Sequence, residues 1–199
     1  MKLTNIVNFL FEVGHLSKTP RTGFFFLGGG YHSVAEHCHR VAYISYILGH
    51  MAQADTDKLI KMGLFHDLAE GRTGDQNYVS KKYVELDEEK VMDEISRSFP
   101  FGGEILDLYK EYEEKKTLEA KLAKDADQLE LLMTLKEQMD LGNKRAKLWT
   151  ISGLKRIKTK EGKALAQVIM KTPADSWWVG DYNNSWWVNP TKKAIRDKD

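Results

Sequence analysis

The sequence predicts an all-α protein, folded as a compact bundle of about six to eight helices. Apolar residues recur at the three- and four-residue spacing of helices through most of the chain, and the alternating pattern of half-buried strands is close to absent. No repeat of solenoid length is visible. For a chain of 199 residues we expect one domain over 1–199, in which 172–199 forms a tryptophan-rich C-terminal extension.

The composition is typical of an ordinary globular protein. Hydrophobic residues make up 42% and charged residues 30%, and the net charge of +1 gives no global field that would favour nucleic acid as a partner. No run of 18 apolar residues is present, so we expect no membrane partner. The N-terminus resembles an amphipathic helix more than a secretory signal. Cys38 is the single cysteine, which excludes an intrachain disulfide and favours a reducing, cytoplasmic location.

The first third of the chain is expected to hold two helices separated by a loop. Residues 3–16 form an amphipathic helix whose apolar side carries Leu3, Ile6, Val7, Leu10 and Val13. One proline and four glycines between Lys18 and Gly30 prevent a long regular element there. Residues 33–52 form the second helix.

The next segment carries the densest cluster of polar residues in an apolar setting. Asp55 or Thr56 caps a helix that is expected to end at Glu70. On such a helix Glu70 shares one face with His66 and Asp67. Residues 71–80 then form a loop that carries Asp75.

Three helices are expected in the middle of the chain. Segments 83–98 and 103–116 are rich in charge and separated by a proline and two glycines, and their acidic residues belong to solvated faces. Residues 117–141 form a longer helix that is apolar almost all round. This pattern predicts deep burial in the core or in a subunit interface.

The last third turns basic. Nine Lys or Arg residues accompany only Glu161 between Lys144 and Lys171, and a helix is expected over 159–171. A solvated basic face is favoured over a surface that binds nucleic acid. Two Ser-Trp-Trp sequences follow, and we expect their tryptophans, Trp177, Trp178, Trp186 and Trp187, to pack on the body of the protein or on a second subunit.

Histidine and aspartate side chains recur on the apolar faces of three predicted helices. His37 falls on the stripe of Val34 and Val41, the pair His66-Asp67 lies in an apolar run, and Asp125 and Asp127 both lie on apolar stripes of 117–141. Burial of such groups costs several kcal/mol unless something compensates it. One divalent transition metal (Mn, Co, Fe, Ni or Zn) would compensate all of them, because these ions accept nitrogen and oxygen ligands.

Each of these residues also has a purely structural interpretation. An isolated His-Asp pair more often forms ordinary buried hydrogen bonds than a metal site. Cys38, between two histidines, is expected to be a small buried residue rather than a ligand. Arg21 either binds a phosphate through two parallel hydrogen bonds of its guanidinium or forms an ion pair with a carboxylate at the surface. Asp75 follows a glycine and suits a turn as well as a substrate contact.

Five motifs occur along the chain in the order Pro20-Arg21-Thr22-Gly23-Phe24, Ser33-Val34-Ala35-Glu36-His37, His66-Asp67-Leu68-Ala69-Glu70, Gly74-Asp75 and Lys124-Asp125-Ala126-Asp127-Gln128-Leu129-Glu130. Taken together, they resemble the HD-domain superfamily of metal-dependent phosphohydrolases, and most closely its 5′-deoxynucleotidase branch. The resemblance covers roughly residues 1–170. It departs from many relatives at Gln76-Asn77-Tyr78, where they carry a proline, so it does not fix the shape of the substrate pocket.

The resemblance implies a specific set of roles. The metal ligands would be His37, His66, Asp67 and Asp127. Asp127 is preferred to Asp125 because the family ligand precedes a residue–Leu–Glu run and because small residues beside it leave space. Glu70 would be the general acid or base, Arg21 would bind the phosphate, and Asp75 would orient substrate or water.

The implied activity is removal of the 5′-phosphate from (deoxy)nucleoside monophosphates by a homodimeric enzyme. Two alternatives stay open at the level of the sequence. One is an HD-domain hydrolase acting on a nucleoside di- or triphosphate or a cyclic nucleotide. The other is a metal- or nucleotide-binding module without turnover.

Overall fold

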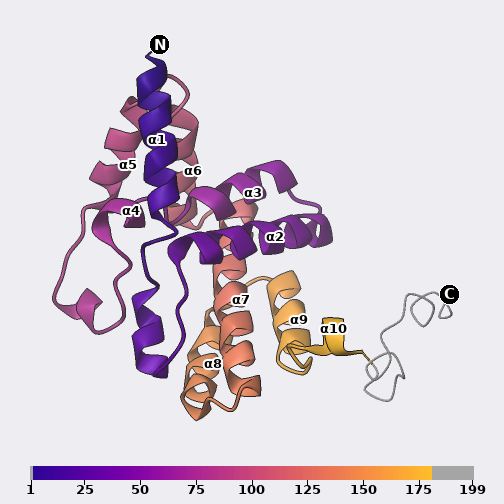
Figure 1. Ribbon diagram of the computed structural model, residues 1–199. Helices are drawn as coiled ribbons and strands as arrows, with labels where there is room; N and C mark the ends of the chain where they lie inside the picture. Colours follow the sequence, from indigo (N-terminus) through magenta and orange to yellow (C-terminus); the bar gives the residue numbers. More distant parts are fainter. Residues whose placement is uncertain (1, 181–199) are drawn as a thin grey trace, which may run out of the picture.

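Helix α7 (Leu118–Asp140) is the axis of the molecule (Figure 1). The computed structural model describes residues 2–180. Within them, α7 contacts five helices, α2 (Val34–Ala52), α3 (Thr56–Phe65), α6 (Gly103–Glu114), α8 (Lys144–Arg156) and α9 (Lys160–Ile169). Most of its side chains between Ala120 and Lys136 are buried, which confirms the predicted burial of 117–141.

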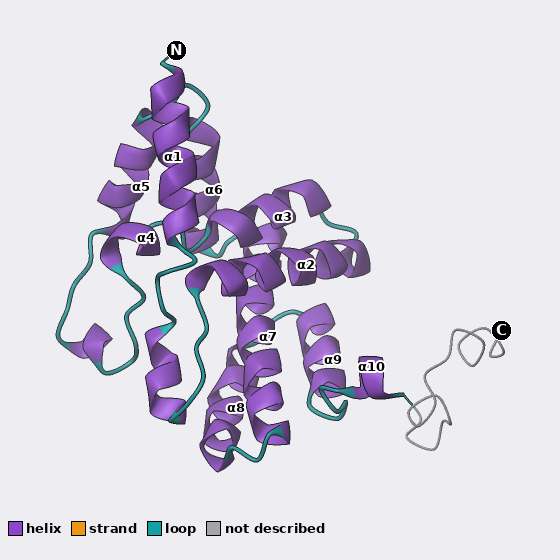
Figure 2. Cartoon of the chain, viewed as in Figure 1, coloured by secondary structure: helices purple, strands orange, loops and turns teal. Residues whose placement is uncertain are grey.

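The predicted all-α class is confirmed: every regular element of the described residues is helical (Figure 2). The further elements are α1 (Leu3–His15), η1 (Thr22–Leu27), α4 (Glu70–Thr73), η2 (Ser80–Lys82), α5 (Glu88–Arg97) and α10 (Ser176–Val179). No helix in residues 2–180 is both long and apolar enough to cross a membrane.

Local sequence fixes where most helices begin. Ser33 and Glu36 form a reciprocal capping box at the start of α2. Five more helices begin at a side-chain oxygen that accepts a backbone N–H of the first turn, from Asp55, Asp87, Thr117, Asn143 and Thr159. Each cap satisfies a donor that the helix itself leaves unpaired.

The helix predicted to run to Glu70 ends earlier. Helix α3 stops at Phe65, and residues 66–69 form tight turns with hydrogen bonds between residues three apart, such as Leu68 N–H to Phe65 O. Glu70 then starts the short helix α4, so the predicted loop 71–80 begins with a helical turn. His66 and Asp67 therefore stand at a helix end, where the chain turns toward the cavity described below.

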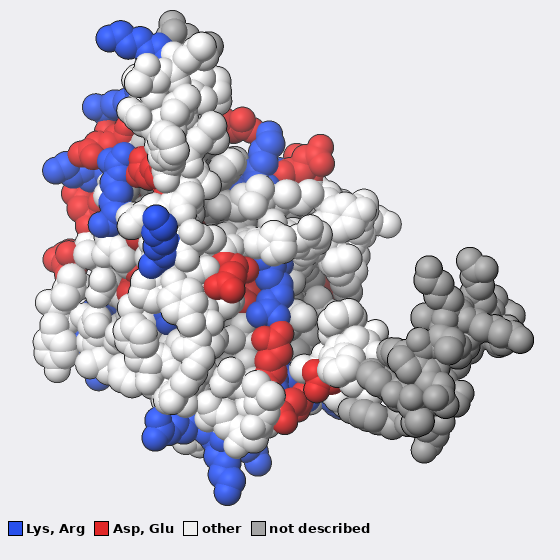
Figure 3. Space-filling model, in the orientation of Figure 1, with Lys and Arg blue, Asp and Glu red and all other residues white. Residues whose placement is uncertain are grey.

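Three further features differ from the sequence-based expectations: the exposed side of α1, the helix over 144–156 and the exposure of two tryptophans. On α1 the predicted apolar side is exposed except for Ile6, which packs on the core together with Phe9, since α1 lies at one end of the molecule. Figure 3 shows an almost uncharged surface over it. The sequence pattern predicts no separate helix over 144–156, yet α8 forms there. Trp177 and Trp178 are exposed rather than packed on the body. Trp186 and Trp187 lie outside the described residues.

Two core clusters meet beside α2. One joins α2, α3, α6, α7 and α9 around Val41 and Leu129, and the other joins α1, α2, α5 and α6 around Val34 and Leu68. His37 lies between Val34 and Val41, at the seam of the two clusters. Helices α2 and α3 approach closely there, because a Cβ at Gly63 would lie 3.1 Å from Ala42 Cα. This close approach places the end of α3 next to His37.

Candidate metal centre and active site

Three helices bring four candidate ligands to one point. His37 Nε2 lies 3.2 Å from His66 Nε2, 3.5 Å from Asp67 Oδ2 and 3.4 Å from Asp127 Oδ1. His66 Nε2 lies 3.3 Å from the same Asp67 oxygen. The structure thus gathers the four residues that the resemblance implies, from α2, the end of α3 and α7.

Both histidine rings are held by their other nitrogen. His37 Nδ1 lies 2.5 Å from Glu130 Oε2, and His66 Nδ1 lies 3.0 Å from the carbonyl oxygen of Gly63. Since these oxygens only accept, each Nδ1 carries a proton, and each Nε2 atom faces the centre. This is the arrangement that carboxylates and carbonyls impose on metal-binding histidines.

The charges at this centre are strongly coupled. Burial and the charge of Arg21 act to lower the pKa of His37, but Glu130 and Asp127 outweigh them and raise it to about 9. Burial alone would raise the pKa of Asp67, yet His66 and Arg21 hold it well below its usual range. The centre is therefore rich in negative charge that attracts protons and other cations.

The residues present fit a divalent cation. Six carboxylates, against four Lys or Arg side chains, line a cavity of about 330 Å³ at the centre. Two histidine Nε2 atoms and two carboxylates, with His37 Nε2 between 3.2 and 3.5 Å from the other three groups, are the donor set that transition metals prefer once the nitrogens have lost their protons. Zinc, manganese, iron, cobalt and nickel all accept such ligands.

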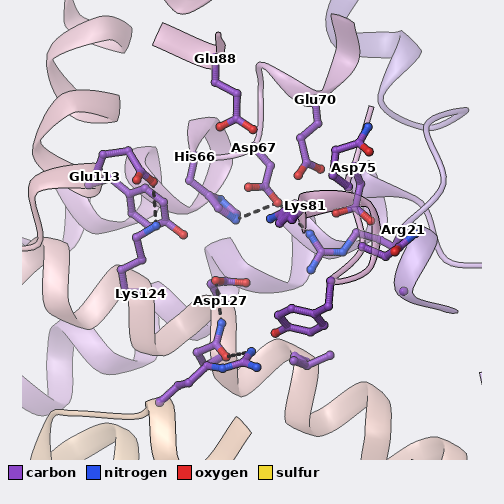
Figure 4. A pocket seen from close by; sticks show the side chains of 18 of the residues that line it. Arg21, His66, Asp67, Glu70, Asp75, Lys81, Glu88, Glu113, Lys124 and Asp127 are labelled. Carbon is purple, nitrogen blue, oxygen red and sulfur yellow. Dashed lines mark hydrogen bonds and ion pairs between the residues drawn. The ribbon is translucent and has the colours of Figure 1, made fainter. Parts of the chain in front are cut away.

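Glu70 faces the cavity beside Asp67 and Asp75 (Figure 4). It is buried, and its Oε2 atom has no hydrogen-bond partner among the described residues. Burial, followed by the charge of Asp67, raises the pKa of the Glu70 carboxyl well above its usual range. A buried carboxyl without a partner is the kind of group that exchanges protons with a substrate.

Arg21 and Asp75 belong to one connected loop structure. Arg21 Nη1 donates to Asp67 Oδ2 at 2.9 Å, and its guanidinium points into the cavity (Figure 4). The Asp75 carboxylate accepts the Thr22 backbone N–H at 2.6 Å and the Thr22 hydroxyl at 3.2 Å. Asp75 thus ties the loop after α4 to the loop that carries Arg21, while still lining the cavity.

The two aspartates of α7 have separate environments. Asp127 points to the cavity and lies near His37. The buried Asp125 carboxylate instead accepts the backbone N–H groups of Lys158 and Thr159 at 2.9 and 2.7 Å, and the Thr159 hydroxyl. Asp125 neither contacts a candidate ligand nor pairs with Lys121. Its contacts fasten α7 to the turn between α8 and α9.

Cys38 is buried, as the sequence predicts. It packs with Leu68 and Met92, and its sulfur lies within 4.8 Å of ligand atoms of His66 and Asp67. Burial raises the pKa of the thiol well above its usual value. Cys38 does not line the cavity of the centre, and its thiol packs in the second core cluster.

Several side chains of the cavity carry no clear signal in the sequence. Lys81, Tyr78, Trp149 and Arg156 line it from a loop and from α8, a helix that the pattern does not predict. Glu130 has such a signal: it lies one helical turn after Asp127, on the same face. A buried His37 needs an acceptor for Nδ1, and Glu130 is the carboxylate that α7 offers.

Comparison with known proteins places the chain among HD-domain proteins. The family model described as "HD domain" matches residues 13–169. The protein named 5′-deoxynucleotidase HDDC2 of Mus musculus is 32% identical over 149 residues, which cover 72% of this chain and 74% of the mouse protein. The protein of that name from Bos taurus is 31% identical over 150 residues, 72% and 73% of the two chains.

A solved structure has the same architecture. The crystal structure of a protein from Pyrococcus horikoshii OT3 superposes with a TM-score of 0.68 and 26% sequence identity. The match covers 83% of this chain and 98% of the archaeal one.

Proposed function

This chain belongs to the HD-domain family, and from that membership we propose that it is a metal-dependent phosphohydrolase that removes the 5′-phosphate from (deoxy)nucleoside monophosphates. Relatives that are 31% and 32% identical to it over 72% of the chain bear the name 5′-deoxynucleotidase. The reaction is hydrolysis of a phosphomonoester: water attacks phosphorus, the bond to the 5′-oxygen breaks, and that oxygen leaves with a proton.

One observation carries the proposal. Two histidines with anchored Nδ1 atoms converge with two aspartates, and His66, both aspartates, Glu70 and Arg21 line one cavity with His37 buried behind it. We assign His37, His66, Asp67 and Asp127 as the ligands of one divalent metal. When bound, such an ion neutralises phosphate charge and makes a coordinated water more acidic.

The remaining roles follow from the side chains of the chain itself. Arg21 offers a planar fork of N–H donors that suits two phosphate oxygens. Glu70 holds a proton on a carboxyl that is short of partners, so it is placed to donate to the leaving 5′-oxygen or to accept from the attacking water. Asp75 holds the loop of Arg21 in place through Thr22 and lines the substrate side of the cavity.

We also propose a homodimer. Large apolar side chains stand exposed on one side of α2 and at the end of α3, namely Tyr43, Tyr46, Ile47, Met51 and Leu64. An apolar face of this kind supports pairing with a second copy. A cytoplasmic location suits the single, buried cysteine. We retain a single domain over 1–199 with 172–199 as its extension.

The decisive experiment is phosphate release from a panel of ribo- and deoxynucleoside mono-, di- and triphosphates. The protein is first stripped with a chelator and then reloaded with Mn, Co, Fe, Ni or Zn in turn. We expect monophosphates to be hydrolysed, one metal per chain, and no activity in stripped protein. Full activity after verified metal removal, or release only from di- and triphosphates, would contradict the proposal.

A further inference from the structure

The carboxylate of Glu130 is shared between the metal centre and a second group of side chains. Its Oε2 atom lies 2.5 Å from His37 Nδ1 and so serves the centre. Its Oε1 atom accepts the Thr134 hydroxyl at 2.8 Å and two N–H groups of Arg40, from Nη2 at 3.0 Å and from Nε at 3.2 Å. The Glu130 side chain is only 2% exposed. Because water has almost no access to it, its orientation depends on the groups that hold Oε1.

Arg40 supplies the positive charge beside this buried carboxylate. His32 Nε2 lies 3.7 Å from the same Oε1 atom, but burial lowers the pKa of His32 below its ordinary value, so its ring is neutral near pH 7. The guanidinium of Arg40 stays charged at any pH in use. A buried carboxylate that loses its counter-charge is costly to keep in place. Glu130 therefore depends on Arg40 for its position.

The guanidinium is itself fixed against helix α7. Arg40 lies on α2, and its partners Glu130, Thr134 and Glu137 follow one another on one face of α7, four and three residues apart. Arg40 Nη2 donates to the Thr134 hydroxyl at 2.8 Å, and Nη1 donates to the Glu137 carboxylate. A planar fork of N–H donors reaches all three groups at once, whereas the single nitrogen of a lysine does not.

Arg40 does not stand on the substrate side of the centre. It is not among the residues that line the cavity of the metal centre. Together with Met133, Glu137 and Trp177 it lines a separate hollow of about 450 Å³. Its connection to the centre therefore runs through Glu130 to His37, and not through a bound phosphate.

We propose that Arg40 is a positioning residue of the metal centre: its fork holds Glu130 in the orientation that fixes His37 Nε2 toward the metal. The inference rests on the proposed function, whose metal it needs, and adds a residue on the far side of the ligands. By charge alone, a cation near the centre repels a metal ion, so its loss would tighten metal binding. Positioning has the opposite sign, because a ligand ring that is no longer held must be ordered when the metal binds.

The test measures the affinity of stripped full-length protein for Co²⁺, by competition with a chelator of known affinity. Arg40→Met keeps the length of the side chain but removes its charge and its donors. It should weaken Co²⁺ binding by about 10-fold, the lower end of the usual loss for an outer partner of a metal-binding histidine. Unchanged or tighter binding would overturn the proposal.

A second variant keeps the charge and changes only the geometry. Arg40→Lys leaves a counter-charge for Glu130, so it folds even where Arg40→Met does not. It should still weaken Co²⁺ binding, by about threefold or more, since one nitrogen does not replace the fork. An affinity equal to that of the unmodified protein would show that a counter-charge alone is enough, and the proposed positioning by the fork would be wrong.

A double variant tests whether Arg40 acts through Glu130. In Glu130→Gln the carboxylate that Arg40 holds is gone, so adding Arg40→Met should change the affinity for Co²⁺ by less than about twofold. If the full loss from Arg40→Met persisted in that background, Arg40 would act by another path and the proposal would fail.

Lys58→Met is the matched control. Lys58 Nζ lies 2.6 Å from Glu111 Oε2 in a partly exposed ion pair between α3 and α6, and neither residue lines the cavity of the metal centre. This variant should bind Co²⁺ like the unmodified protein. Urea unfolding of the stripped proteins is measured in parallel. A purely structural Arg40 would lower the free energy of unfolding and leave the affinity of the folded protein unchanged, which contradicts the proposal.

The outcomes separate this inference from the proposed function. If the unmodified protein binds no divalent metal, the proposed function fails and the role of Arg40 fails with it. If the unmodified protein binds metal and hydrolyses monophosphates while Arg40→Met binds metal as tightly, only this inference is wrong.

Discussion

The metal end of the cavity and its outer wall are built by opposite means. At the metal end, His37 on α2 and His66 at the end of α3 are buried, Asp127 on α7 is half-buried, and each ring nitrogen of the two histidines has a partner or faces the centre. At the outer wall, Tyr78 and Trp149 stand on a loop and on an outer helix, and they are partly or largely exposed. Bond-breaking needs fixed atoms, whereas the outer wall only has to leave room for the rest of the substrate. The difference predicts that substitutions in the two regions will have effects of very different kind and size.

The largest effect is expected at the metal end. Asp127→Ala should abolish metal binding and hydrolysis together, because the site loses an anionic ligand that also pairs with His37. Metal content measured after dialysis, beside phosphate release, checks this. Its control is Asp125→Ala, which leaves the backbone N–H groups of Lys158 and Thr159 unpaired. That variant should keep its metal and lose about 1–3 kcal/mol of unfolding free energy. A metal-free Asp125→Ala beside a metal-replete Asp127→Ala would reverse the assignment.

The next effect separates catalysis from metal binding. Glu70→Gln keeps the shape of the side chain but removes its acid–base function, so turnover should fall by about 10²–10⁴-fold with metal content unchanged. Steady-state kinetics and metal analysis on one preparation measure both quantities. Loss of metal in this variant would make Glu70 a ligand.

A smaller effect is expected from Glu130, which would act on a bound metal only through its contact with His37 Nδ1. Glu130→Gln should weaken metal binding by about 10- to 100-fold, the usual loss for an outer partner of a metal-binding histidine. The folded variant remains able to hydrolyse substrate at saturating metal. An unchanged dissociation constant would show that Glu130 acts only in packing.

The pH dependence of metal binding tests the same pair. Glu130 and Asp127 raise the pKa of His37 to about 9 against burial and Arg21, so below that pH the metal must displace a proton. Affinity should therefore rise with pH, by about tenfold per unit for one proton, and level off near pH 9. In Glu130→Gln the pKa of His37 falls, so the plateau should begin at lower pH. Metal titrations between pH 6 and 10 give both curves.

The smallest expected effect is the coupling between the metal end and the outer wall. Glu70→Gln and Tyr78→Ala have no contact with each other, so their effects on kcat/KM should multiply to within about twofold in the double variant, as for independent sites. The four enzymes of this cycle are compared on one deoxynucleotide. A coupling of tenfold or more would mean that the outer wall and proton transfer are not separable.

Sequence reasoning reached the metal end far better than the outer wall. His37 was predictable because it interrupts an apolar stripe of period 3.6, and such a stripe must be buried. Glu70 was predicted to face the cavity from a continuous helix, and it does so from a separate turn, because α3 ends at Phe65. Residues 66–69 form tight turns whose Leu68 and Ala69 pack in the second core cluster. The local sequence pattern does not predict this packing.

No sequence pattern predicts that Trp149 and Arg156 line the cavity. Helix α8 is rich in basic residues, and such residues are equally typical of a solvated face. Which of them reach the cavity depends on how α8 packs on α7, and thus on contacts between residues far apart in the sequence. Asp125 makes the same point, since its partners at Lys158 and Thr159 lie more than 30 positions away.

The half-exposed setting of the outer wall makes substrate range the most adjustable property of this molecule. Substitutions at such positions usually change stability by about 0.5 kcal/mol or less, whereas buried ligands tolerate almost none. Tyr78 and Lys81, both exposed side chains that line the cavity, can therefore be varied in a library without unfolding the chain. Such a library would re-aim the same hydrolytic centre at phosphate esters of other alcohols, with Arg21 and the metal ligands left untouched.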